Sequence, residues 1–149
     1  MENILIVDDD EKIREMLSDI LTHKGYAVKS VGTGKEAITE SNKQLFNLAL
    51  IDILLPDMEG TELLTKLRKS EPEMIKIIIT GNATLDNSIS AANKGVDGFI
   101  VKPFDPKKLL KLIESKLEEQ REKMQFNEKK VAEYIELRHE WMANNRYKK

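Results

Sequence analysis

The sequence predicts an α/β domain built on one parallel, doubly wound sheet. Five short aliphatic segments alternate with five segments of helical character, and the connections between them are short. Such alternation is typical of parallel strands joined by crossover helices. No low-complexity segment or convincing internal repeat interrupts the pattern.

The first strand is expected at residues 4–7, where an aliphatic run ends abruptly in Asp8-Asp9-Asp10. The following apolar residues recur with the spacing of one helix face, and an Asp at 9 or 10 can cap that helix. They are Ile13, Met16, Leu17, Ile20 and Leu21. Gly25 is expected to end this helix.

The rest of the domain repeats the alternation. Its expected strands are residues 27–31, 48–52, 75–79 and 98–101, the first of them weak and near a sheet edge. Its expected helices are residues 34–43, a helix through Leu63, Leu64 and Leu67 that stops before Pro72, a modest one on Leu85, Ile89 and Ala92 that Gly95 closes, and a long one from Asp105 onward.

A single carboxylate interrupts the most apolar of these segments. The run from Leu48 to Leu55 is aliphatic except for Asp52, and Pro56 and Gly60 make the following residues a loop. Burying a carboxylate is costly unless a charge or a metal ion compensates it. Asp52 is therefore expected to have either a structural partner or a chemical role.

Composition narrows the class of protein. The 149 residues are 40% hydrophobic and 34% charged, with no cysteine, which excludes disulfides, thiolate metal sites and cysteine nucleophiles. Residues 1–106 hold 12 Lys+Arg and 18 Asp+Glu, whereas residues 107–149 hold 12 and 8. No apolar run is long enough to span a membrane and the N-terminus lacks a basic signal-peptide start, so we expect a cytoplasmic protein with no membrane partner.

Polar residues follow four of the predicted strands. Asp8 and Asp9 follow the first, Asp52 the third, Thr80 the fourth and Lys102 the fifth. In an open parallel sheet the site lies outside the carboxyl ends of the strands, so these side chains are expected to meet. Taken singly, the acids could cap a helix, the threonine could be a turn residue and the lysine a surface residue. The combination of these residues indicates a functional site far more specifically than any one of them does.

Clustered carboxylates repel one another unless a cation intervenes, and Mg²⁺ suits oxygen ligands. A lysine can pair with Asp52 or with a phosphoryl oxygen, and a threonine hydroxyl can donate to the same oxygen. This set predicts a carboxylate nucleophile arranged for phosphoryl transfer, that is, an aspartyl-phosphate site.

Four motifs resemble the receiver domain of two-component response regulators over about residues 1–118. They are Val7-Asp8-Asp9-Asp10, the stretch from Asp52 to Gly60, Thr80-Gly81 and Lys102-Pro103-Phe104. The resemblance implies a flavodoxin-like fold of strand order 2-1-3-4-5. It also implies that Asp52 takes phosphate from a histidine kinase and that Mg²⁺ is the cofactor.

The resemblance further implies roles for individual residues. Asp8, Asp9 and Asp52 with the Leu54 carbonyl would hold Mg²⁺, and Thr80, Gly81 and Lys102 would bind the phosphoryl group. The Lys102-Pro103 bond would be cis. Phe99 matches the aromatic switch position, without a tyrosine hydroxyl, or is a plain core residue. Leu54 is expected to obstruct an attacking water and Asn82 to help it, so no phosphate lifetime is predicted.

The receiver domain is expected to end near residue 119, leaving residues 120–149 as a helical extension. An a/d heptad pattern runs through the fifth helix and this extension. One position of the pattern holds Leu110, Leu117, Met124, Val131 and Arg138, and the other holds Ile113, Gln120, Asn127, Tyr134 and Trp141. Three interpretations follow: a dimeric coiled coil continuing the fifth helix, a break near Asn127 with a second helix that folds back or binds another protein, or a frayed tail. The tail lacks a recognisable nucleic-acid motif, so direct nucleic-acid binding is not expected.

The sequence thus predicts a phosphorylation-controlled binding switch rather than an enzyme. It would signal to a downstream protein, or by forming a homodimer, through its fourth helix, fifth strand and tail. A phosphorelay intermediate is an alternative. A Mg²⁺-dependent phosphatase for small phosphoesters is another, disfavoured because Leu54 stands where a second acid would be needed.

Overall fold

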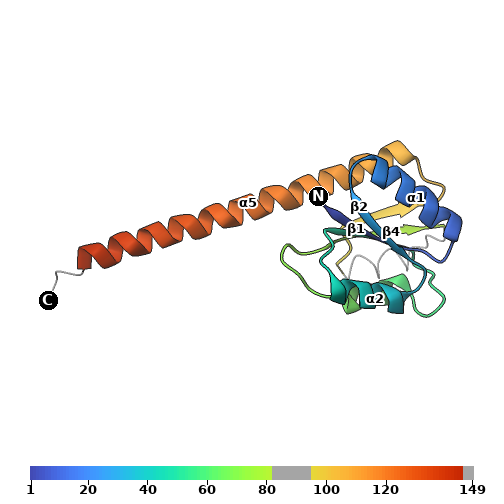
Figure 1. Cartoon of the computed structure of the whole chain (residues 1–149), viewed down its shortest axis with the longest axis horizontal. Coiled ribbons are helices and arrows are strands. Elements are labelled where there is room, and N and C mark those ends of the chain that lie inside the picture. Colours follow the sequence, from blue (N-terminus) through green and yellow to red (C-terminus); the bar gives the residue numbers. More distant parts are fainter. Residues whose placement is uncertain (82–94, 146–149) are drawn as a thin grey trace. The chain divides into compact units, whose positions relative to one another are not determined.

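The structure, a computed structural model, describes residues 1–81 and 95–145. A five-stranded parallel sheet forms its centre, in the order β2-β1-β3-β4-β5 (Figure 1). The strands are β1 (Asn3–Val7), β2 (Ala27–Val31), β3 (Leu48–Ile51), β4 (Ile75–Thr80) and β5 (Gly98–Val101). The predicted strand order is therefore confirmed. β1 lies between β2 and β3, and the chain reverses its direction of winding there.

The described helices are α1 (Glu11–His23), α2 (Gly34–Lys43), α3 (Gly60–Lys66) and α5 (Pro106–Asn145). The helix expected on Leu85, Ile89 and Ala92, and Asn82 before it, lie outside the described residues. The break considered near Asn127 is absent from α5, which passes through that residue as one helix. Among the described residues, the structure has no helix long and apolar enough to cross a membrane.

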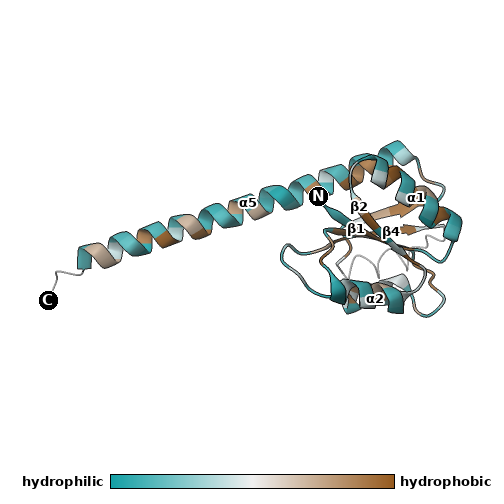
Figure 2. Cartoon of the chain, in the orientation of Figure 1, coloured by the Kyte–Doolittle hydropathy of each residue, from teal (hydrophilic) through white to brown (hydrophobic). Residues whose placement is uncertain are grey.

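A hydrophobic layer covers each face of the sheet, because alternate strand residues point to opposite faces. One layer joins Ile6 and Leu50 to α1 and to the first turns of α5, including Ile113. The other joins Leu5 and Ile51 to α2 and α3. Strands buried on both faces are near-continuous aliphatic runs, and Figure 2 shows brown strands between helices α1 and α2, which are largely teal.

Asp10 caps α1. Its carboxylate accepts hydrogen bonds from the backbone N–H groups of Lys12 and Ile13, at 2.9 and 3.4 Å. The sequence left the cap open between residues 9 and 10, and the structure assigns it to Asp10. Asp8 and Asp9 therefore do not cap the helix, and both lie at the end of β1.

The chain divides into two compact units, residues 1–117 and residues 118–149. The first contains the sheet and all four polar strand ends. The second is the C-terminal part of α5, in which residues 121–144 are all exposed.

Candidate functional site

The polar side chains lie at the carboxyl ends of four strands. Asp8 directly follows β1, Asp52 follows β3, Lys102 follows β5, and Thr80 is the last residue of β4. Asp8, Asp52 and Thr80 are only 3%, 8% and 1% exposed. A parallel sheet brings these ends together, so residues far apart in the sequence become neighbours.

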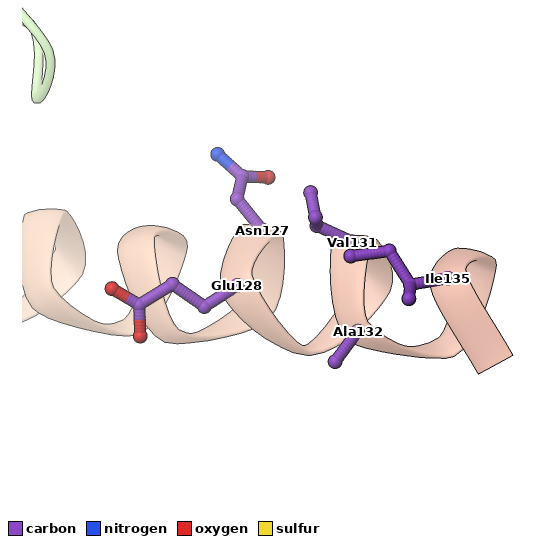
Figure 3. A pocket seen from close by; sticks show the side chains of 5 residues that line it. All are labelled: Asn127, Glu128, Val131, Ala132 and Ile135. Atoms are coloured by element: carbon purple, nitrogen blue, oxygen red, sulfur yellow. The ribbon is translucent and has the colours of Figure 1, made fainter.

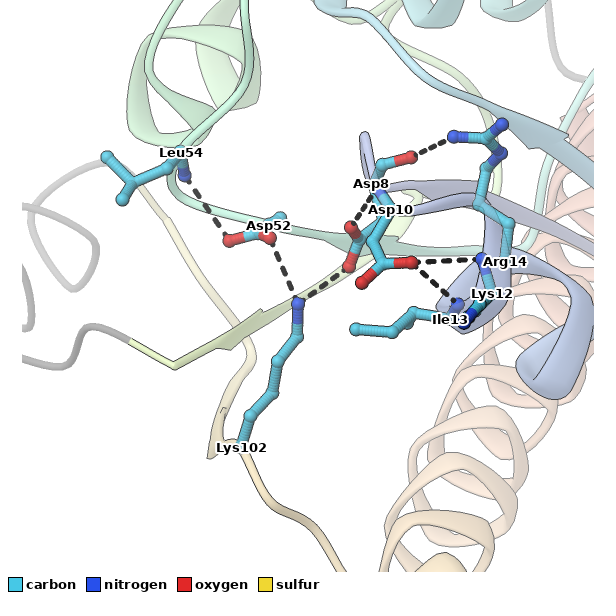
Figure 4. A network of polar contacts seen from close by, with 8 residues as sticks. All are labelled: Asp8, Asp10, Lys12, Ile13, Arg14, Asp52, Leu54 and Lys102. Atoms are coloured by element: carbon cyan, nitrogen blue, oxygen red, sulfur yellow. Dashed lines mark hydrogen bonds and ion pairs between the residues drawn. The ribbon is translucent and has the colours of Figure 1, made fainter.

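Lys102 joins two of the carboxylates. Its Nζ donates to Asp8 Oδ2 at 2.8 Å and to Asp52 Oδ2 at 3.0 Å, as Figure 4 shows. The backbone N–H of Lys102 donates to the carbonyl of Thr80 at 2.8 Å, which sets the start of the lysine at the end of β4. Lys102 therefore bridges β1 and β3 from a loop on β5.

The Asp8 segment is held from three directions. The backbone N–H of Asp8 donates to the Val31 carbonyl at 3.1 Å, and Asp8 Oδ1 accepts from the backbone N–H of Asp10 at 2.9 Å. Arg14 Nη1 donates to the Asp8 carbonyl at 2.6 Å (Figure 4). The sequence analysis missed Arg14, whose only signal is its position one helical turn into α1, on the side of the aspartates.

Asp52 is positioned by the loop that follows it. Its backbone N–H donates to the Val7 carbonyl at 2.9 Å, and its Oδ1 accepts from the backbone N–H of Leu54 at 3.3 Å. The loop returns so closely that the N–H of Gly60 donates to the Ile53 carbonyl at 2.6 Å. A Cβ on Gly60 would overlap the Asp52 carbonyl oxygen, so only glycine fits here.

A second contact fastens this loop to α2. Asp57 accepts hydrogen bonds from the backbone N–H groups of Gly34 and Lys35, at 2.8 and 2.9 Å. The Met58 sulfur packs so tightly on Gly34 that a Cβ there would lie 2.5 Å from it. Asp57 is a positioning residue that the sequence analysis did not single out, because an acid after proline is also common in ordinary turns.

The electrostatics of the site favour a cation. Burial raises the pKa of the Asp8 carboxyl above its ordinary value, although the hydrogen bonds from Lys102 and Asp10 oppose this. Burial acts to lower the pKa of Lys102, but its hydrogen bonds to Asp8 and Asp52 outweigh that effect and raise the pKa. The lysine therefore stays charged, while the Asp8 carboxylate is incompletely compensated.

The donor set fits Mg²⁺. Carboxylate oxygens of Asp8, Asp9 and Asp52 all lie within 4.8 Å of one another. They are hard oxygen ligands, and Asp9 is exposed, which leaves a route for an ion that retains waters. The pocket thus offers both the ligands and the access that a divalent cation needs.

The remaining predicted residues lie in β5 and in the loops that follow β3, β4 and β5. Leu54 is 53% exposed at the mouth of the loop. Phe99, in β5, is half-buried and packs against the hydrophobic layer of α2 and α3. Gly81 is exposed directly after β4, and the Lys102-Pro103 peptide bond is cis.

Comparison with known proteins establishes the class. A family model described as the response regulator receiver domain matches residues 4–114. The chain therefore belongs to the response regulator receiver family, the class of phospho-accepting modules in two-component signalling.

Curated relatives are longer than this chain. It is 31% identical over 117 residues to the transcriptional regulatory protein GlrR of Escherichia coli (strain K12), covering 78% of this chain and 26% of that protein. It is 29% identical over 146 residues to the transcriptional regulatory protein SrrA of Staphylococcus aureus (strain NCTC 8325 / PS 47), covering 97% of this chain and 60% of that protein. The chain thus spans less than two thirds of either relative.

Solved structures share the fold. A CheY-like response regulator receiver domain from Methanospirillum hungatei JF-1 is 47% identical with a TM-score of 0.79, covering 83% of this chain and 98% of that one. A beryllofluoride-activated NtrC4 receiver domain, solved as a dimer, is 32% identical with a TM-score of 0.74, covering 80% and 99%.

Proposed function

We propose that Asp52 accepts a phosphoryl group from a histidine kinase and that the acyl phosphate switches the binding of a partner. The observation that carries the proposal is the position of the Asp52 carboxylate. It is nearly buried at the end of β3, and Lys102 holds one of its oxygens at 3.0 Å beside the Asp8 and Asp9 carboxylates. A carboxylate in this setting is oriented and can be neutralised when it reacts.

In the proposed step an Asp52 carboxylate oxygen attacks the phosphorus of a phosphohistidine. The new O–P bond forms as the N–P bond breaks, and the electron pair of that bond returns to the imidazole nitrogen. Lys102 Nζ exchanges its contact with Asp52 for one with a phosphoryl oxygen while keeping Asp8. The Thr80 hydroxyl and the backbone at Gly81 complete the phosphoryl site from the end of β4.

Asp8, Asp9, Asp52 and the Leu54 carbonyl would hold Mg²⁺, which supplies neutralisation of the charge shared by carboxylate and phosphoryl oxygens. Arg14 and Asp57 support these ligands through the backbone, at Asp8 and at the loop after Asp52. The protein's own contribution is therefore orientation of three acids and one ammonium group.

The switch would run from the phosphoryl site to β5. Thr80 ends β4, and its strand partner in β5 is Val101, two residues from Phe99. A shift of Thr80 toward a phosphoryl oxygen would change the packing of Phe99 and hence this face's affinity for a downstream protein or a second copy. We place this role in the cytoplasm, where ATP-dependent kinases act, and propose no catalytic turnover beyond slow self-dephosphorylation.

Phosphoryl transfer tests the proposal directly. The purified chain is mixed with a phosphorylated histidine kinase or with acetyl phosphate, and the fraction phosphorylated is measured with and without Mg²⁺. We expect stoichiometric, Mg²⁺-dependent labelling that is lost in Asp52→Asn and kept in the matched variant Asp19→Asn on the outer face of α1. Turnover of the donor without a retained adduct would favour the phosphatase alternative, and onward transfer to a histidine phosphotransfer protein would favour the relay.

A further inference from the structure

The C-terminal unit leaves large apolar side chains in water. All residues from 121 to 144 are exposed, and Val131, Tyr134 and Trp141 are 58%, 62% and 66% exposed. An exposed apolar surface of this extent is typical of an interaction site. Figure 2 shows its brown residues distributed among teal ones along α5.

These side chains follow a seven-residue repeat. Position a is occupied by Met124, Val131 and Arg138, and position d by Asn127, Tyr134 and Trp141. Ile135 and Met142 at position e widen the same stripe. A spacing of 3.5 residues per turn is the period of a left-handed coiled coil and differs from the 3.6 of a helix packed on a globular core.

We infer that a second copy of this chain covers the stripe, and that the two α5 helices pair as a parallel, in-register coiled coil over residues 124–142. The inference goes beyond the proposed function, because it needs no phosphoryl group at Asp52. It concerns the C-terminal unit alone.

Charge complementarity selects the parallel orientation. In a parallel pair, each g residue faces the e residue five positions later in the other helix. Lys123 is at g and Glu128 at e, so the pair occurs twice by symmetry. The following g residue, Lys130, faces Ile135 of the other helix, on which its aliphatic stem can pack. In an antiparallel pair g residues face g residues, so neither Lys123 nor Lys130 would face an acid.

Asn127 selects the register. Among the d residues of the exposed span 124–142 it alone has a polar amide, and in the in-register pair it faces its own counterpart, with which it can exchange hydrogen bonds. A slip of one heptad would place the amide against Tyr134. Asn127, Glu128, Val131, Ala132 and Ile135 line a shallow hollow of about 390 Å³ on this helix (Figure 3), the form of surface into which a facing side chain inserts.

Arg138 limits the affinity. In the parallel pair it opposes a second arginine at position a, which costs stability even though its long stem lets the guanidinium reach water. The coil is thus expected to dissociate reversibly rather than to be permanent.

Disulfide trapping tests both contact and orientation, because the chain has no cysteine of its own. Asn127→Cys and Tyr134→Cys, made separately in the full chain, are expected to cross-link into dimers under mild oxidation. Glu136→Cys, on the opposite face of the helix, is the matched control and is expected to stay monomeric under the same conditions. Cross-linking at only one of the two d positions would indicate an antiparallel pair, and equal cross-linking at Glu136→Cys would indicate random collision; either overturns the inference.

A charge exchange gives an independent measurement without cysteine. By analytical ultracentrifugation, Lys123→Glu alone is expected to weaken the dimer about tenfold, since two surface ion pairs each become a repulsion. The double variant Lys123→Glu with Glu128→Lys is expected to restore it. A chain that is monomeric at high concentration, or a double variant no better than the single one, overturns the inference. Asp52→Asn is expected to dimerise like the parent, which keeps this test separate from phosphorylation.

Discussion

Lys102 Nζ lies 2.8 Å from Asp8 Oδ2 and so joins the end of β5 to the end of β1, across 94 residues of sequence. The lysine side chain is 18% exposed and the aspartate side chain 4%. Removing only one partner of a nearly buried ion pair destabilises the folded protein, because the other charge is left buried and uncompensated.

Replacing Lys102 by alanine is therefore expected to lower the free energy of unfolding in metal-free buffer by about 1–3 kcal/mol, because it leaves Asp8 and Asp52 uncompensated. Mg²⁺ should recover part of this loss. Urea unfolding with and without Mg²⁺ measures both effects, and Lys108→Ala on exposed α5 surface is the control. A Lys102→Ala chain as stable as the parent without Mg²⁺ would show that the ion pair contributes nothing.

Replacing Asp8 by asparagine should change the pH dependence of stability. Because burial raises the pKa of Asp8, the folded chain binds this proton more tightly than the unfolded chain, so the stability from this group is present in acid and lost as pH rises above 3.8. In metal-free buffer, Asp8→Asn should remove that decline while weakening Mg²⁺ binding. Unfolding from pH 3 to 7 and titration calorimetry check the two effects; an unchanged pH profile would contradict the first.

Arg14 is expected to act on the metal site only through the backbone. Arg14→Ala frees the Asp8 carbonyl and should weaken Mg²⁺ binding by about threefold to tenfold, the effect of losing one charge-assisted hydrogen bond. Lysine at 14 should restore part of the affinity. Calorimetric titration measures the change, and Arg68→Ala, distant from the aspartates, is the control.

Asp57 should stabilise the chain in neutral solution and not in acid. Hydrogen bonds from the backbone N–H groups of Gly34 and Lys35 lower its pKa, so its contribution is present above the pKa of the unfolded chain and is lost as pH falls through the folded value, below 3.8. Asp57→Ala should lower the unfolding midpoint at pH 7 and have little effect near pH 3. An equal decrease of the unfolding midpoint at pH 7 and at pH 3 would mean that the charge of Asp57 does not contribute to stability.

Gly60→Ala should be the most disruptive small substitution near the site. The new Cβ would collide with the Asp52 carbonyl, so the loop has to move, with an expected cost of about 2–4 kcal/mol and reduced phosphoryl acceptance. Gly81→Ala is the contrast, since a Cβ there would lie an ordinary 3.9 Å from Lys102. Thermal unfolding compares the two variants, and we expect a lower midpoint for Gly60→Ala. Similar midpoints for both would argue against the close approach of Gly60 to the Asp52 carbonyl.

Sequence patterns were sufficient where periodicity and burial determine structure. The aliphatic runs placed all five strands, and the strand ends placed Asp8, Asp52, Thr80 and Lys102 on one edge of the sheet. Patterns could not show Arg14 donating to a backbone carbonyl or Asp57 bonding to α2, because both contacts depend on how distant loops meet. Asp9 and Asp10 were equivalent as caps in the sequence, and only the backbone geometry of α1 separates them.

The central claim is that the phosphoryl group is carried by Asp52. After phosphorylation, borohydride reduction converts an aspartyl phosphate to homoserine, and peptide mass spectrometry locates the changed residue. We predict homoserine at position 52 and none at positions 8 or 9. A reduced residue at Asp8 or Asp9, or phosphorylation with no homoserine at all, would contradict the account.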